Sequence, residues 1–306
     1  MFICFRLKKG YSDTFFQNCF EQNMHGKQLA KHITSGARSN GLLNISRGRF
    51  FGVEIPTPLP SEQQKIADCL ASLDELIAAE SEQLDALKAH KKGLMQQLFP
   101  REGETTPRLR FPEFKDTSKW AAKAIGSLCK TFSGGTPSTS NPNYYGGEIP
   151  FIRSAEIGKN QTELFLTNDG LINSAAKLID RGDVLVALYG ANSGDVSLAK
   201  INGAINQAIL CLKSKACNGY IYQYLSFQKD WITSTYLQGG QGNLSGEIIK
   251  SIEIPIPSLH EQQRIANCLS SLDDQIAVQS EKVDALKEHK KGLLQQLFPI
   301  PEEIDA

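Results

Sequence analysis

The sequence has no apolar run of about 18 residues, the length that a membrane-spanning helix needs, and so it predicts no membrane segment and no membrane partner. At the N-terminus, the charges of MFICFRLKKG follow the short apolar stretch, which is not the order of a secretory signal. The seven cysteines form no C-x-x-C pair, which favours free thiols in a reducing compartment over zinc. These absences predict a cytoplasmic protein without a metal site.

The chain also has no excess of one charge, because 33 Lys and Arg balance 33 Asp and Glu. This balance argues against a protein that coats DNA nonspecifically. The charges are unevenly distributed: residues 1–53 hold eight basic and two acidic residues, 54–100 four and eight, 101–251 sixteen and thirteen, and 252–306 five and ten. A polyanion would be drawn to the first and third segments. Chance segregation is the alternative, since helices favour glutamate.

An internal repeat organises the chain. Residues 54–100 and 253–299 align without a gap at an offset of 199, and about two thirds of the positions are identical. Each copy opens with Pro-x-Pro, which is incompatible with a helix, and ends at Phe-Pro, where proline stops one. Ser61 with Gln64, and Ser258 with Glu261, each fit a capping box, so we expect the two helices to begin a few residues apart in register.

Within each copy the apolar positions recur with the 3.5-residue period of a coiled-coil seam. Such a helix from Glu62 to Leu98 would be about 55 Å long at ~1.5 Å per residue, and we expect the two copies to lie antiparallel with their seams in contact. An unrelated oligomerisation coiled coil is the alternative. The seam positions are Ile66, Leu70, Leu73, Ile77, Leu84, Leu87, Leu94 and Leu98 in the first copy, and Ile265, Leu269, Leu272, Ile276, Val283, Leu286, Leu293 and Leu297 in the second.

Two seam positions are polar in both copies, namely Glu80 with Gln279 and Lys91 with Lys290. Polar seam residues commonly set the register or the choice of partner at some cost in stability. These positions are therefore the expected determinants of how the two helices pair.

Between the helices, a polar linker at 101–106 precedes a predicted α+β domain at 107–252, and 300–306 forms a tail. Short apolar runs at 149–153, 183–190 and 204–213 predict strands, and 220–237 predicts an amphipathic helix. The predicted loops are 134–147 and 238–246.

Residues 1–53 resemble the last part of a second such domain. ICFRLKKGYSDTFF parallels ILCLKSKACNGYIY, and Gly41-Leu-Leu-Asn-Ile-Ser parallels Gly240-Gln-Gly-Asn-Leu-Ser at the same offset of 199. The fold class expected is thus α+β, with one globular domain, two long antiparallel coiled-coil helices and the C-terminal remnant of a first domain.

Catalytic and metal motifs are weak. His260-Glu261 begins a zincin motif but lacks the second histidine, and the recurring His90 and His289 sit among helical lysines. The loop GGQGNLSG lacks the lysine of a phosphate-binding loop. Asn141–Tyr144 is one residue from the Asn-Pro-Pro-Tyr motif of amino-methyltransferases, but no glycine-rich cofactor loop accompanies it. We expect no catalytic residues and no metal ligands.

The blocks IPxPxxxEQQ-[KR]-IA and LDALKxHKKGL-[ML]-QQLFP, each present twice around a domain that opens with PRLRFPEF and GGTPS, resemble the specificity subunit of type I restriction-modification enzymes. The resemblance covers essentially the whole chain. It implies target-recognition domains that read the two halves of a split double-stranded DNA sequence, spacer helices that bind two modification subunits, and a restriction subunit that joins the complex. S-adenosylmethionine, ATP and magnesium would belong to those partners, with no cofactor on this chain.

The sequence departs from the family pattern at its start, where the first domain is only a tail. Three explanations follow: a truncated or recombined product, a half-subunit that associates with itself or with another fragment, or a missing part supplied by a separate polypeptide.

Affinity for DNA comes mainly from lysine and arginine at phosphates, and sequence is read by polar side chains at base edges. Arg153 and Gln241 are the preferred candidates for base readout, because arginine pairs with guanine and glutamine with adenine. The full set of candidate DNA contacts is Thr136, Ser138, Tyr144, Tyr145, Arg153, Lys159, Tyr189, Asn192, Gln241 and Asn243, with Asn141, Asn160, Gln161, Ser193 and Gln238 beside them.

The leading hypothesis is therefore a non-catalytic DNA-recognition subunit that directs adenine methylation and restriction by its partners. The second is a coiled-coil scaffold for the modification subunit that has lost DNA binding. The third, a methyltransferase, rests on Asn141–Tyr144 alone, and cofactor binding by the isolated chain would discriminate it.

Overall fold

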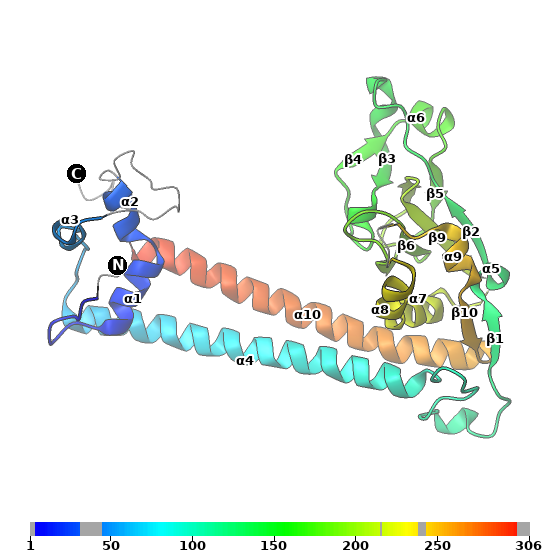
Figure 1. Cartoon of the computed structure of the whole chain (residues 1–306), viewed down its shortest axis with the longest axis horizontal. Coiled ribbons are helices and arrows are strands. Elements are labelled where there is room, and N and C mark those ends of the chain that lie inside the picture. The colour runs from blue at the N-terminus through cyan, green and yellow to red at the C-terminus, as the bar shows by residue number, and fades with distance from the viewer. Residues whose placement is uncertain (1–3, 31–44, 215, 238–242, 299–306) are drawn as a thin grey trace. The chain divides into compact units, whose positions relative to one another are not determined.

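The chain divides into two compact units in the computed structural model (Figure 1). Unit 1 comprises residues 1–86 and 276–306, and unit 2 comprises residues 87–275. Two helices of 39 residues, α4 (Pro60–Leu98) and α10 (Leu259–Leu297), contribute to both units. In the part of the chain that is described, no helix is both long and apolar enough to cross a membrane. The described residues are 4–30, 45–214, 216–237 and 243–298.

Unit 1 contains three short helices beside the first part of α4 and the last part of α10. They are α1 (Asp13–Glu21), α2 (Met24–Ala30) and α3 (Arg47–Phe51), and the described residues of this unit form no strand. Ser46 caps α3, because its Oγ accepts a hydrogen bond from the N–H of Arg49. The core of the unit joins α1 and α2 to both long helices and consists of Phe15, Cys19, Met24, Ala67, Leu70 and Phe298.

Unit 2 is a mixed domain of three antiparallel or largely antiparallel sheets with short helices. β1 (Ala121–Ala124) pairs with β10 (Glu253–Ile256). The second sheet, called sheet B, has the order β2 (Cys129–Ser133), β9 (Ile209–Ser214), β6 (Val184–Ala187) and β7 (Val196–Leu198). The third has the order β4 (Leu164–Leu166), β3 (Tyr145–Ile152), β8 (Gly203–Ile205) and β5 (Lys177–Ile179).

The helices of unit 2 are short apart from its shares of α4 and α10. α7 and α8 follow β9, and α9 leads into β10. The bounds are η1 (Pro112–Phe114), α5 (Ile125–Leu128), η2 (Pro142–Tyr144), η3 (Ser154–Glu156), α6 (Asn168–Ile172), α7 (Asn218–Phe227), α8 (Lys229–Tyr236) and α9 (Gly246–Ser251).

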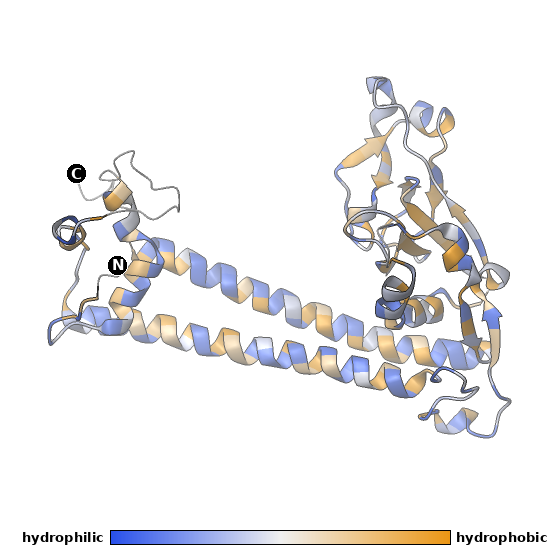
Figure 2. Cartoon of the chain, in the orientation of Figure 1, coloured by the Kyte–Doolittle hydropathy of each residue, from blue (hydrophilic) through white to orange (hydrophobic). Residues whose placement is uncertain are grey.

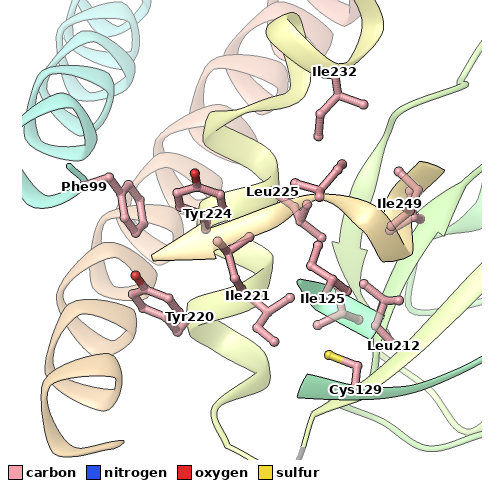
Figure 3. Packing of buried hydrophobic residues seen from close by; sticks show 14 of the residues in the cluster. Phe99, Ile125, Cys129, Leu212, Tyr220, Ile221, Tyr224, Leu225, Ile232 and Ile249 are labelled. Atoms are coloured by element: carbon pink, nitrogen blue, oxygen red, sulfur yellow. The ribbon is translucent and has the colours of Figure 1, made fainter. Parts of the chain in front are cut away.

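In both units the phenylalanine at the end of a long helix packs on a short helix. In unit 2, Phe99 at the end of α4 packs its ring 5.2 Å from Tyr224 of α7 (Figure 3). In unit 1, Phe298 at the end of α10 packs its ring 5.4 Å from Phe15 of α1. α1 falls at the positions that the sequence parallel assigns to α7. The end of each long helix is thus fixed on the helical part of the domain that precedes the other long helix.

The local caps recur as well. Ser245 caps α9 as Ser46 caps α3, and both serines accept a hydrogen bond from the N–H three residues later. Gln63 and Gln262, which are equivalent and buried, each donate to the carbonyl of the proline five residues earlier, Pro58 and Pro257. The serine caps and the buried glutamines thus match between the two copies, and the assignment of residues 1–53 to the last part of a first domain stays a prediction.

The helix starts differ from the sequence prediction. α4 and α10 begin at equivalent residues, Pro60 and Leu259, so the predicted difference in register was wrong. Pro60 takes the first helical position, where its missing N–H costs nothing, and Ser61 lies inside the helix. Ser258 does cap α10, since its Oγ accepts from the N–H of Glu261, but the Glu261 carboxylate binds Arg110 instead of completing a capping box.

Within each unit the two long helices lie antiparallel (Figure 1), and apolar residues of both helices belong to one hydrophobic cluster. In unit 1, Asp74 of α4 pairs with Lys290 of α10, whereas Glu80, further along α4, pairs with Lys282, earlier in α10. Figure 2 shows apolar residues recurring along both helices between hydrophilic ones. None of the predicted seam residues is classed as exposed, and Leu70, Leu84, Leu98, Ile265, Leu269 and Val283 are buried.

The α+β fold class is confirmed, but three element predictions needed correction. The segment 253–256 is a strand paired with β1 and so belongs to the globular domain that was expected to end at 252. The helix predicted over 220–237 is two helices, α7 and α8, separated at Gln228. The strand predicted over 204–213 is two strands, β8 and β9, because Asn206 and Gln207 form a turn between them.

Candidate nucleic-acid interface

Three polar loops of unit 2 meet at one end of sheet B. The register pairs Ser133 of β2 with Leu210 of β9, and Ala187 of β6 with Ile209 of β9. Because neighbouring strands are antiparallel, the loop after β2, the turn before β9 and the turn after β6 leave the sheet at the same end. We call this end, formed by residues 134–138, 206–208 and 188–195, the polar loop end.

Hydrogen bonds fix these loops to one another. Thr136 Oγ1 donates to Gln207 Oε1 over 2.7 Å, and the N–H of Leu188 donates to the carbonyl of Ala208. The N–H of Leu244 donates to the carbonyl of Leu188, which brings the segment after residue 242 to the same place. Thr136, Tyr189, Asn192 and Asn243 therefore belong to one surface, as strand topology requires.

The turn between β6 and β7 presents its side chains on a rigid backbone. Gly190 and Gly194 have φ values of +83° and +88°, which only glycine adopts without strain. Ser193 Oγ donates to the carbonyl of Leu188 over 2.8 Å, so this serine supports the turn. Tyr189 is exposed, and Asn192 is half-exposed and uses only its backbone carbonyl in the turn.

Ser138, Tyr144 and Tyr145 flank the polar loop end. Tyr145 donates its hydroxyl to the carbonyl of Pro137, which ties the start of β3 to the loop after β2. Ser138 is exposed and shares a hydrogen bond with Ser140. Tyr144 is half-exposed, and its carbonyl accepts from the N–H of Thr167. The Tyr145 hydroxyl thus stabilises the loop after β2, and Ser138 offers the more accessible polar group.

Arg153 and Lys159 lie on a separate loop that follows β3. The Arg153 guanidinium donates to Glu156 over 2.9 Å and to Glu163 over 2.5 Å, so two carboxylates hold the donors that base readout would need. Burial works to raise the pKa of Glu156, but hydrogen bonds from Arg153 and from backbone N–H groups outweigh it and hold the pKa at about 2. Lys159 is exposed. Arg153 has a structural role here, and its base contact stays a prediction.

Gln207 is a polar group of this surface that sequence reasoning missed. It is exposed and accepts the hydrogen bond of Thr136. The sequence feature that could have identified it is the polar pair Asn206-Gln207 inside an apolar run, because such a pair indicates a turn and not a continuous strand. Gln238 and Gln241 lie outside the described residues, and Asn160 and Gln161 are exposed on the Arg153 loop.

The polar seam positions of the long helices pair across the two helices in each unit. In unit 2, Lys91 Nζ lies 2.5 Å from Asp273, and in unit 1 the equivalent Lys290 lies 2.5 Å from Asp74, the equivalent of Asp273. Gln279 donates to its own equivalent, Glu80, over 2.7 Å. The aspartates were not singled out from the sequence, because both lie outside the apolar seam.

Unit 2 also contains a buried ion pair without a counterpart among the described residues of unit 1. Arg110 Nε lies 2.7 Å from Glu261 Oε1, and a second nitrogen lies 2.8 Å from Oε2. The hydrogen bonds that Arg110 donates to this carboxylate raise the pKa of Arg110. The glutamate of the weak zincin motif is therefore engaged in holding the start of α10 to the segment that opens the domain.

No group of three or more metal-binding side chains assembles among the described residues. All seven cysteines are free thiols. Burial raises the pKa of the Cys19 thiol to about 12 and that of Cys129 to about 11, so neither supplies a thiolate at neutral pH.

These features define a class of protein: a mixed helix–sheet domain with a hydrogen-bonded polar loop surface, attached to two copies of a long helix. The family model described as "Type I restriction modification DNA specificity domain" matches residues 117–288, which is more than half of the chain. The chain belongs to this family, and the resemblance found in its sequence motifs is confirmed.

Curated relatives carry the same designation. The chain is 29% identical over 283 residues to a putative type I restriction enzyme MjaX specificity subunit of Methanocaldococcus jannaschii, covering 89% of this chain and 64% of that relative. It is 25% identical over 239 residues to the EcoR124I/EcoR124II specificity subunit of Escherichia coli, covering 72% of this chain and 55% of that relative. The chain therefore spans less than two thirds of the length of these two relatives.

Solved structures support the fold. The type I system S subunit of M. genitalium aligns with a TM-score of 0.63 at 16% identity, covering 96% of this chain and 74% of that one. The HsdS subunit of Thermoanaerobacter tengcongensis aligns with a TM-score of 0.50 at 19% identity, covering 96% and 72%. At these identities the likeness concerns the fold alone.

Proposed function

We propose that unit 2 is a target-recognition domain that reads double-stranded DNA with the polar loop end of sheet B. The observation that carries the proposal is the convergence of Thr136, Tyr189, Asn192, Gln207 and Asn243 on one hydrogen-bonded surface. Direct readout needs polar side chains held in fixed positions against base edges. Lys159 would add a phosphate contact, which positions the domain without reading sequence.

The long helices supply the second half of the proposal. We propose that α4 and α10 bind modification subunits, which would methylate adenine, and that a restriction subunit joins this complex. The exposed faces of the two helices remain for such partners, because their seams are turned toward each other within each unit. No cofactor is proposed for this chain; S-adenosylmethionine, ATP and magnesium would act on the partners. We place the protein in the cytoplasm, where the DNA substrate is.

Selection from a random duplex library tests the function. The full chain is mixed with its modification subunit at several salt concentrations, and the bound DNA is sequenced. We expect one enriched motif and a binding constant that falls as salt rises. A complex that assembles but enriches no motif would support the alternative, a scaffold without DNA recognition. S-adenosylmethionine binding by the chain alone would instead indicate a methyltransferase.

Arg153→Ala addresses the predicted base contact. If the guanidinium leaves its two glutamates to reach a guanine, the variant should lose roughly 1–3 kcal/mol on the enriched motif and much less on random DNA. Equal losses on both DNAs would refute the base contact and leave Arg153 with its structural role. Glu156→Gln serves as the control, because it weakens the hydrogen bonds that hold this loop and leaves the Arg153 guanidinium in place.

A further inference from the structure

The two long helices differ most in sequence in one short stretch near their middle. Six of the ten residues at 75–84 differ from those at 274–283, whereas only two of the fifteen at 85–99 differ from those at 284–298. The last parts of the two helices are therefore nearly identical. The contacts of the central stretch, which lies in unit 1, show what the difference does.

Antiparallel pairing gives this central stretch a special geometry. Away from it, a residue faces a different position of the other copy, as Asp74 faces Lys290. At the centre a position faces its own equivalent, because Gln279 is equivalent to Glu80 at the offset of 199 and donates to Glu80 Oε2 over 2.7 Å. A pair of identical helices would bring two identical side chains together here.

The central contact uses different groups from the two helices. Lys282 Nζ lies 2.7 Å from Glu80 Oε1, and Gln279 donates both to Oε2 and, over 2.9 Å, to the main-chain carbonyl of Glu80. The Glu80 side chain is 13% exposed and Gln279 is 8% exposed, so solvent screens these contacts little. At the position of Lys282, α4 has Gln83. α4 thus supplies the carboxylate, and α10 supplies the amide and the cation.

The charge pairs on either side of the centre do not distinguish the two copies. Asp74 with Lys290 and Asp273 with Lys91 are the same contact, formed once in each unit. Two α4 helices could form it too, with Asp74 of one and Lys91 of the other. The apolar seam is the same in seven of its eight positions. Of these contacts, only the central one separates a mixed pair from a pair of like helices.

We propose that Glu80, Gln279 and Lys282 make the pairing of the long helices selective, so that α4 accepts α10 and rejects a second α4. In a pair of α4 helices two Glu80 carboxylates would meet, with Gln83 where α10 has its lysine. Like charges that lose solvent without a cation beside them disfavour a contact, and such repulsion is a common source of pairing specificity. A helix of another polypeptide, or of a second copy, fits α4 only if it presents an amide and a cation as α10 does. The inference is independent of DNA binding.

A double substitution in the full chain reproduces the rejected contact within one molecule. Gln279→Glu with Lys282→Gln gives α10 the polar centre of α4. We expect the amides of 76–86 and 276–286 to exchange hydrogen roughly tenfold faster than in wild type at pH 7, because the centre of the helix pair opens more often. Hydrogen exchange followed by mass spectrometry measures these rates.

Two further variants separate complementarity from damage to one helix. Adding Glu80→Gln and Gln83→Lys to the first variant exchanges the two centres and should restore the wild-type rate. Ala89→Glu also gives α4 the residue of α10, but at an exposed position, and should leave the rate unchanged. Wild-type exchange in the first variant overturns the proposal, as does a fast rate that exchanging the centres does not restore.

Carbodiimide cross-linking of the wild-type chain tests the rejection of a second α4 directly. An Asp74–Lys290 product marks α4 paired with α10 and serves as the positive control. An Asp74–Lys91 product arises only between two chains, because these residues lie about 25 Å apart along one helix. We expect the first product alone at every protein concentration. Detection of the Asp74–Lys91 product would show that two α4 helices do pair and would overturn the proposal.

Discussion

Units 1 and 2 contain equivalent positions of the repeat that differ in how deeply they are buried. Ile249, Ile252 and Ile254 of unit 2 lie beneath β1, α5 and β2, whereas Phe50, Val53 and Ile55 of unit 1 form the wall of an open pocket. In both units the phenylalanine at the end of a long helix nevertheless packs on a short helix, Phe99 on α7 and Phe298 on α1. The comparison teaches that the short helices of unit 1 have a core of their own, which they share with the two long helices.

The largest expected loss of stability follows from breaking the Arg110–Glu261 ion pair. Among the described residues, only unit 2 has such a pair. Glu261 is 1% exposed, so Glu261→Ala leaves the Arg110 charge buried without a partner and should cost ~3–5 kcal/mol. The matched control is Glu62→Ala, the exposed equivalent in α4, which should stay within about 0.5 kcal/mol of wild type. Both tryptophans, Trp120 and Trp231, lie in unit 2, so urea unfolding followed by tryptophan fluorescence reports on that unit.

Replacing both members of the pair sharpens this prediction. Arg110→Met combined with Glu261→Leu removes both charges and should recover most of the loss, because a buried pair replaced by apolar groups is often neutral. If Glu261→Ala were as stable as wild type, the claim that the buried charge of Arg110 needs Glu261 as its partner would be contradicted.

Ile254→Ala and Ile55→Ala compare the covered and open surfaces directly. Ile254 is fully buried under β1, so its truncation should cost ~2–4 kcal/mol, mainly through the cavity that remains. Ile55 is half-buried at the pocket, and its truncation should cost ~1 kcal/mol or less. Hydrogen exchange measured by mass spectrometry separates the two units. Equal protection losses at the two sites would show that the unit 1 surface is covered after all.

Acid titration tests the loop that carries Arg153. The pKa of Glu156 in the folded protein is about 2, below the value of ~4.3 for an unfolded glutamate. Its stabilisation is therefore present above pH ~4.3 and is lost as the pH falls toward 2, by roughly 1–3 kcal/mol. Glu156→Gln should reduce the change in the unfolding free energy of unit 2 between pH 6 and pH 3. Tryptophan fluorescence in urea measures this free energy. Glu163→Gln, at a more exposed partner of Arg153, should reduce this pH dependence less. If Glu156→Gln kept the pH dependence of wild type, Glu156 would not be the group that causes it.

Much of the helical architecture could be predicted because the sequence of the long helix occurs twice in the chain. The offset of 199, the 3.5-residue period and the Phe-Pro stops fixed the identity and the ends of both long helices, and the structure adds that they start at equivalent residues. The parallel between residues 1–53 and the end of the complete domain also covers α3, because its Ser46 cap matches the Ser245 cap of α9.

The contacts that depend on distant parts of the chain could not be predicted. Nothing local shows that Arg110 would meet Glu261, or that Asp273 would meet Lys91, because these pairs form only after the long helices are placed. The turn at Asn206 was read as strand, because the flanking residues are apolar and β-branched. Arg153 was chosen because arginine pairs with guanine, and its two carboxylate partners come from the three-dimensional fold of its loop.

The most direct test of DNA reading by the polar loop end compares two asparagines at opposite ends of sheet B. Asn192 lies in the turn after β6, and Asn202 lies beyond the far end of β7, where its side chain accepts the N–H of Arg181. Each is changed to alanine in the full chain, and the affinity for the enriched motif is measured with the modification subunit present. The account predicts a loss of ~1–3 kcal/mol for Asn192→Ala and no loss for Asn202→Ala. Wild-type affinity in Asn192→Ala, or an equal loss in both variants, would contradict it.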